Sequence, residues 1–276
     1  MRSGYQVNTM KINRVAILRN WSMTIACLLL TMACVPAVFA QRSADSGNEI
    51  QRLSRTAQVA AQQGRHEDAL RLYNQIAALA ASEPKIAARA HFNMGNTYMQ
   101  LKKFDLAVGA FQRAVALDPV LADAHNNMGE SLGELRQYPR ALEAFTRASA
   151  LDPQLSKARY NMGVTYDRLG QLKYAEFIYR HLIRDKPEYS LAYDGLAVTL
   201  SKSGRAAEAV SLHEKAISLN PRDGSFYYNL AISYLIMGNQ IKAREQEERL
   251  RQIDPQIAGR LASVINRAVG STGGRQ

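Results

Sequence analysis

The five histidines of this 276-residue chain are the side chains best suited to bind a metal or to transfer protons. No histidine stands in a metal-ligand motif such as HExxH, and the chain has no glycine-rich phosphate loop. His91 and His125 are 34 residues apart in a repeated pattern, which would hold them about 10 Å apart, too far to share a metal. The sequence therefore predicts a protein that is not an enzyme, with no metal and no cofactor. The full set is His66, His91, His125, His181 and His213.

Both cysteines, Cys27 and Cys34, lie in the first 40 residues, so cleavage there would leave no thiol. Residues 1–40 are typical of an export signal, with a basic segment, the apolar run SMTIACLLLTMACVPAVFA and a small-residue site ending at Ala40. Two other fates fit: residues 21–40 could remain as a membrane anchor, or Cys34 could be lipidated, although Thr31 stands three residues before it, where a lipidation signal usually has leucine. In each case the rest of the chain lies in the periplasm or cell envelope. Met10 is a second candidate start.

The formal net charge of +11 does not by itself indicate a nucleic-acid partner. Four of the basic residues lie in the acid-free first 40 residues, which leaves 31 basic against 24 acidic residues, or +7, in the remainder. These remaining cations are scattered, whereas a nucleic-acid surface needs them clustered. We therefore expect no nucleic-acid partner and no small-molecule substrate.

Asparagine recurs at one position of the repeated pattern, as Asn93, Asn127, Asn161 and Asn229, with Gly195 interrupting the row. A carboxamide both donates and accepts, so it can hold the N–H and C=O of one peptide group. With units about 10 Å apart and an extended chain rising about 3.3 Å per residue, one asparagine would meet every third residue of a bound peptide. Asparagine could also simply be common at this place in such repeats.

The pattern itself has a period of 34 residues and is marked most clearly by prolines. An alanine lies twelve residues before each proline, and a glycine or alanine lies twelve residues before that. Apolar residues between these markers follow helical spacing, and small residues allow two helices to approach closely. A period of this length predicts a solenoid of helix pairs. The three rows are Pro119, Pro153, Pro187, Pro221 and Pro255; Ala107, Ala141, Ala175, Ala209 and Ala243; and Gly95, Gly129, Gly163, Ala197 and Ala231.

The units resemble tetratricopeptide repeats. One unit carries the family pattern as Met94, Gly95, Tyr98, Ala107, Phe111, Ala114 and Pro119, and the following units repeat most of it. The resemblance implies an all-α fold, a right-handed superhelical solenoid of about six helix pairs with a C-terminal capping helix. It also implies that the first helix of each pair lines the concave face.

The spacing of the prolines sets the expected boundaries of the repeat units, and the composition of the flanking segments sets the others. They are residues 1–40 for the signal segment, 41–48 for a linker, 49–87 for a divergent first repeat, then units 88–121, 122–155, 156–189, 190–223 and 224–257, a capping helix at 258–269 and a disordered tail at 270–276. The unit at 190–223 has Gly195 and His213 where the other units have asparagine and mostly an aromatic residue. We expect a softer joint there.

The resemblance implies a peptide-binding groove on the concave face. Its N-terminal half is polar and its C-terminal half more apolar, which predicts a protein partner with apolar or aromatic anchors. The candidate binding residues are Asn93, Asn96, Asn127, Tyr160, Asn161, Tyr228 and Asn229. The family's two-carboxylate clamp is matched only in part, because Phe92 and Asn161 stand where the clamp has cations.

Exported tetratricopeptide proteins of this size are similar to assembly factors for pili, secretion systems or envelope complexes. The resemblance therefore implies a non-enzymatic scaffold in the cell envelope, most similar to the pilus-assembly type. An accessory or regulatory subunit that delivers a partner to a glycan or lipoprotein biosynthetic enzyme is the alternative. Membrane association could occur through residues 21–40.

Overall fold

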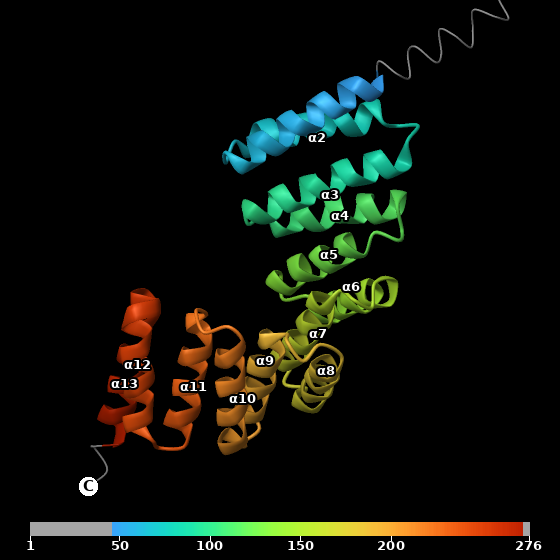
Figure 1. Ribbon diagram of the computed structural model, residues 1–276. Helices are drawn as coiled ribbons and strands as arrows, with labels where there is room; N and C mark the ends of the chain where they lie inside the picture. The colour runs from blue at the N-terminus through green and yellow to red at the C-terminus, as the bar shows by residue number, and fades with distance from the viewer. Residues whose placement is uncertain (1–45, 273–276) are drawn as a thin grey trace, which may run out of the picture.

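The computed structural model describes residues 46–272, with side chains to Ala268, and all regular secondary structure over that range is helical. The signal segment expected at residues 1–40 lies outside the described residues. Helices stack side by side into an arc that runs from the N-terminal helix to α13 (Figure 1), so the expected all-α solenoid is confirmed. After the N-terminal helix (residues 46–62) come α2 (His66–Leu79), α3 (Pro84–Gln100), α4 (Phe104–Leu117), α5 (Ala122–Glu134), α6 (Tyr138–Leu151), α7 (Ser156–Arg168), α8 (Leu172–Asp185), α9 (Ser190–Lys202), α10 (Ala206–Leu219), α11 (Gly224–Ile236), α12 (Gln240–Ile253) and α13 (Pro255–Thr272).

The two helices of a unit pack through a contact between a glycine and an aromatic ring. A Cβ atom added at Gly95 would lie 2.5 Å from the ring of Phe111, and one added at Gly129 would lie 2.6 Å from the ring of Phe145. Any side chain there would push the ring away, so the packing of this core requires glycine. Gly163 meets Tyr179 in the same way, at 2.5 Å.

The turn between the two helices of a unit places one residue in the left-handed conformation, with positive φ. That residue is glycine in some units and not in others. Gly170, Gly204 and Gly238 have φ values of 71°, 80° and 74°, which glycine adopts without strain. Lys102 and Arg136 stand at the equivalent positions with φ of 56° and 57°. Because a Cβ atom makes this conformation costly, these two turns hold backbone strain.

The ends of the array differ from the expected boundaries. Residues 46–48, assigned from sequence to a linker, are already helical. The capping helix is α13, which begins at Pro255 because Asp254 accepts hydrogen bonds from the backbone N–H groups of Gln256 and Ile257 at 3.0 and 2.9 Å. It also takes in residues 270–272 of the expected tail, and residues 273–276 lie outside the described residues. Across residues 46–272, no helix is long and apolar enough to span a bilayer.

Candidate functional site: the concave groove

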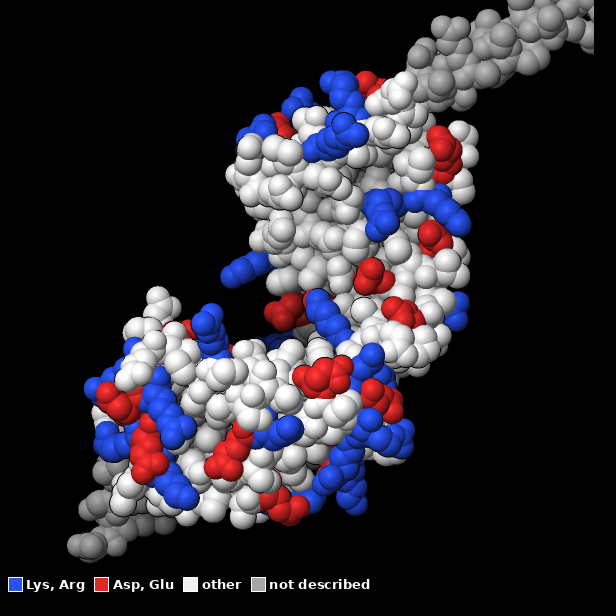
Figure 2. Space-filling model, in the orientation of Figure 1, with Lys and Arg blue, Asp and Glu red and all other residues white. Residues whose placement is uncertain are grey.

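The first helices of the units form the inner face of the arc. Helices α3, α5, α7, α9 and α11 contact one another in order along the array, whereas the second helices of successive units make no comparable contact within residues 46–272. Elements that approach each other lie on the inside of a curve, so these five helices line the concave face. Figure 2 shows a recess between the two halves of the arc, with acidic and basic side chains around it.

The asparagine row faces this groove, but its amide groups bind neighbouring repeats. Asn127 Nδ2 donates to Asn96 Oδ1 at 2.8 Å. Asn161 Nδ2 donates to Asn126 Oδ1 at 3.2 Å and to Glu130 Oε1 at 3.0 Å. Each of these bonds runs back to the preceding first helix, so the row links the helices of the groove floor. An extended peptide would have to share these amides or replace their bonds.

The two ends of the row differ from each other. Asn229 Nδ2 donates to Asp194 Oδ2 at 2.8 Å, which repeats the backward bond across the unit that carries Gly195. Asn93 makes no side-chain hydrogen bond within the described residues and lines a hollow of about 230 Å3 beside Tyr73 and Arg89. The structure therefore leaves Asn93 the freest of the four asparagines.

Glu130 organises the centre of the groove, although it is not among the binding residues expected from the sequence. Its carboxylate accepts from Asn126 Nδ2 at 2.8 Å and from Asn161 Nδ2 at 3.0 Å, and it pairs with Lys157 Nζ at 2.8 Å. Its signal in the sequence is its place, one helical turn after the asparagine row. The network joins α5 to α7 and holds the two helices in register.

The two tyrosines among the candidate binding residues, Tyr160 and Tyr228, are half-buried in the walls of the groove. The Tyr160 ring packs against Tyr179 and Tyr189 with centroid distances of 5.9 and 6.1 Å. Burial, with a smaller contribution from the charge of Asp194, raises the pKa of Tyr160 to about 12, so its hydroxyl stays neutral. Tyr228 packs against the buried core that α11, α12 and α13 form. Both rings therefore support the fold as well as the groove surface.

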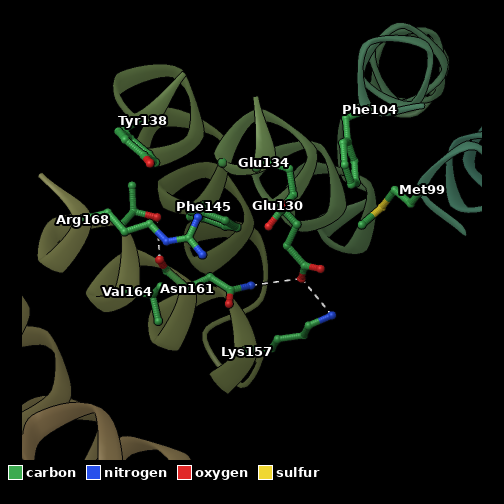
Figure 3. Close-up of a pocket in the computed structure, with 13 residues that line it drawn as sticks. Met99, Phe104, Glu130, Glu134, Tyr138, Phe145, Lys157, Asn161, Val164 and Arg168 are labelled. Carbon is green, nitrogen blue, oxygen red and sulfur yellow. Dashed lines mark hydrogen bonds and ion pairs between the residues drawn. The ribbon is translucent and has the colours of Figure 1, made fainter. Parts of the chain in front are cut away.

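A hollow of about 380 Å3 opens into the groove between α5 and α7 (Figure 3). Its floor is formed by the buried residues Gly129, Phe145 and Thr165. Two carboxylates and two cations also line it. These are Glu130, Glu134, Lys157 and Arg168, with Met99, Phe104, Gly133, Tyr138, Asn161 and Val164 completing the lining.

A buried polar network occupies the joint that was expected to be soft. His213 Nδ1 lies 2.7 Å from Asp194 Oδ1, and its Nε2 lies 3.1 Å from Ser233 Oγ, which also contacts Ser201 Oγ at 2.8 Å. The packing argues against a softer joint at Gly195 and His213, because a Cβ atom at Gly195 would lie 2.7 Å from the Tyr179 ring and His213 is fully buried.

The order serine, histidine, carboxylate matches that of hydrolase triads, but here it has a structural setting. Ser233 is 1% exposed and His213 0% exposed, so no substrate can reach the hydroxyl. The network satisfies polar groups between α9, α10 and α11 instead. Within residues 46–272, no group of three or more potential ligands is placed to hold a metal ion.

His91 and His125 share one position of the repeat, and His125 makes a structural contact there. His125 Nε2 lies 3.3 Å from the carbonyl oxygen of Pro119, and Tyr193 and Tyr227 donate to Pro187 and Pro221 from the equivalent position at 3.1 Å. Burial lowers the pKa of His125, and the Pro119 carbonyl partly opposes this effect. This side chain thus ties the start of a first helix to the preceding turn.

Comparison with known proteins agrees with this architecture. Residues 88–119, 122–155, 156–189, 191–220 and 214–245 match family models described as tetratricopeptide repeat, and together these matches cover more than half of the chain. A comparison with curated proteins found no match.

Solved structures of tetratricopeptide proteins share the fold at low sequence identity. A tetratricopeptide repeat protein from Parabacteroides merdae has a TM-score of 0.68 at 20% identity, over 79% of this chain and 86% of that chain. PilW, described as a widely conserved type IV pilus biogenesis factor, has a TM-score of 0.63 at 23% identity, over 75% and 94%. PilF of Pseudomonas aeruginosa has a TM-score of 0.62 at 17% identity, over 79% and 98%. The helix pairs, the glycine–aromatic contacts and these matches together show that the chain belongs to the tetratricopeptide repeat family.

Proposed function

We propose that this protein is a scaffold of the cell envelope that binds a peptide or protein segment in its concave groove during assembly of a pilus, secretion system or other envelope complex. The repeat family and the fold support a protein-interaction scaffold, since such repeats expose long concave surfaces for binding. The observation that carries the proposal is the groove itself, a continuous surface of five first helices with a hollow at its centre.

The proposed role in pilus assembly rests on the likeness to PilW and PilF. That likeness by itself shows a shared fold and not a shared role. The proposed location in the cell envelope rests on the export pattern expected in residues 1–40. The mass of the chain isolated from cells tests this location: a start at Gln41, a lipidated Cys34 or an intact 21–40 segment in the envelope fraction would each agree. A chain confined to the cytoplasmic fraction would contradict it.

Groove binding can be tested with variants that leave the hydrogen bonds and ion pairs between the repeats intact. Asp123 on α5 and Ile236 on α11 occupy exposed groove positions, and neither side chain makes an ion pair or hydrogen bond within the described residues. The groove variant Asp123→Arg with Ile236→Asp should lose the partner captured from envelope extract by the wild-type chain. The loss should be about tenfold or more, since each change opposes a partner's contact by about 1.4 kcal/mol or more.

A matched control exists on the outer helices. Glu143→Arg on α6 with Ile241→Asp on α12 makes the same chemical changes at exposed positions. The control should capture the partner as the wild type does. Equal capture by the groove variant and the control would contradict binding in the groove.

A further inference from the structure

The hollow between α5 and α7 exists because one residue lacks a side chain. Gly133 stands at the groove position that holds Met99, Asp167, Ser201 and Leu235 in the other units, and a Cβ atom added to it would meet no atom within 4 Å. Gly129, one turn earlier, is different, because its Cβ atom would lie 2.6 Å from the Phe145 ring. Packing thus requires glycine at 129 and not at 133. Since glycine destabilises a helix interior relative to alanine, the structural effect of Gly133 is to leave space.

The space is surrounded by groups that suit an aromatic ring. Phe104, Tyr138 and Phe145 contribute rings from α4 and α6, and Met99 contributes its thioether from α3 (Figure 3). Aromatic rings pair favourably edge to face or offset, and a methionine sulfur makes favourable contacts with a ring. The volume of about 380 Å3 is at the low end of ligand pockets, enough for one large side chain.

The charges at the rim balance, which favours an uncharged occupant. Glu130 is already paired with Lys157 at 2.8 Å. Glu134 and Arg168 are exposed at the edge, and within residues 46–272 neither side chain makes an ion pair or hydrogen bond. One free anion and one free cation remain, so a charged side chain would meet one repulsive neighbour for each attractive one. An uncharged ring meets neither penalty.

We propose that this hollow receives an aromatic side chain of the bound segment and so fixes the segment's register in the groove. The inference rests on the proposed groove function and adds the chemistry of the anchor. It also moves the anchor site from the C-terminal half of the groove, where the sequence indicated it, to the centre between α5 and α7.

The direct test is a binding measurement with capped tripeptides, read at the methyl group of Met99. The full chain is labelled with ¹³C at its nine methionine methyl groups, and the Met99 signal is assigned from a Met99→Leu variant. An acetyl-Gly-Phe-Gly-amide peptide at about 10 mM should shift the Met99 signal, because a ring current acts on a methyl group in contact and small ligands bind in the millimolar range. The Lys and Glu versions of the peptide should leave it unchanged.

Two glycine variants separate filling of the hollow from loss of structure. Gly133→Leu places in the hollow the side chain that Leu235 has in a later unit, and it should abolish the shift while the chain stays folded. Gly109→Leu on the outer helix α4 is the matched control, since a Cβ atom at Gly109 also meets nothing within 4 Å. It should leave the shift intact.

A Met99 signal that does not move with the Phe peptide would overturn the proposal, as would a larger shift with the Lys or Glu peptide. A Phe-induced shift that survives in Gly133→Leu would place the ring elsewhere and would also overturn it. Failure here can be told from failure of the groove function. If Asp123→Arg with Ile236→Asp loses the partner while Gly133→Leu retains it, groove binding stands and the aromatic pocket falls.

Discussion

Asn229, on the groove surface, donates to one oxygen of Asp194 at 2.8 Å, and the buried ring of His213 contacts the other oxygen of the same carboxylate at 2.7 Å. Asp194 thus connects the groove lining to the core between α9, α10 and α11. Removal of this carboxylate would leave two polar groups without their partner, one of them fully buried.

Asp194→Ala should therefore lower the free energy of unfolding by about 3 kcal/mol, because a buried donor left unsatisfied costs more than a lost surface pair. Asp185→Ala removes an exposed ion pair with Arg159 and should cost about 1 kcal/mol or less. Urea unfolding monitored by circular dichroism measures both. Equal effects of the two substitutions would contradict the assigned role of the network.

Alkaline pH should destabilise the protein through Tyr160. Burial raises the pKa of Tyr160 in the folded chain to about 12, whereas an unfolded tyrosine titrates near about 10. Between these values the unfolded state loses a proton that the folded state keeps, so stability falls as pH rises, by about 2 kcal/mol over the window. Burial also raises the pKa of Tyr179, which adds to the loss.

Urea unfolding at about pH 9 and about pH 11.5 tests this window. Tyr160→Phe keeps the ring contacts and removes the titrating group, so it should lose measurably less stability than the wild type between the two pH values. An identical loss in both proteins would show that Tyr160 does not contribute.

Substitution of two glycines in one helix should have opposite effects. Gly129→Ala would force a Cβ atom to within 2.6 Å of the Phe145 ring and should destabilise by about 1–3 kcal/mol. Gly133→Ala meets open space and should stabilise by about 0.5–1 kcal/mol through helix propensity. Thermal melts of the two variants give the signs, and a loss of stability in both would mean that the space at Gly133 is not open.

The strained turns offer a further comparison. Lys102→Gly should raise the free energy of unfolding by about 0.5 kcal/mol, because release of the left-handed strain slightly exceeds the entropy cost of glycine. Gly170→Ala, at the equivalent turn, should lower it by about 1 kcal/mol. If the melting temperatures of the two variants moved in the same direction, the strain assigned to Lys102 would be refuted.

The helix pairs were predictable from sequence because their packing requires particular residue types at a fixed spacing along the chain. The proline and alanine rows recur every 34 residues, and the glycine row marks where a ring lies on a backbone. Position in the groove was predictable for the asparagines for the same reason.

Their bonding was not predictable, because it depends on the side chains that face them from the preceding unit. The residues that accept these bonds stand at two different positions of the repeat, and spacing alone does not show which position will accept. They are Asn96 at one position and Asn126 and Asp194 at the other. The hollow was equally hidden, since Gly129 and Gly133 look alike in the sequence. The network at His213 joins residues 19 and 20 positions apart on three helices, so its members share no local pattern.

Site-specific photo-crosslinking in cells tests the central claim most directly. A photoreactive phenylalanine analogue is placed at groove positions 100, 123 and 236 and, as matched controls, at outer positions 143 and 241, all of them exposed. The account predicts that the groove positions yield an adduct with one common partner and that the outer positions do not. An adduct formed from positions 143 and 241, and absent at 100, 123 and 236, would contradict binding in the concave groove.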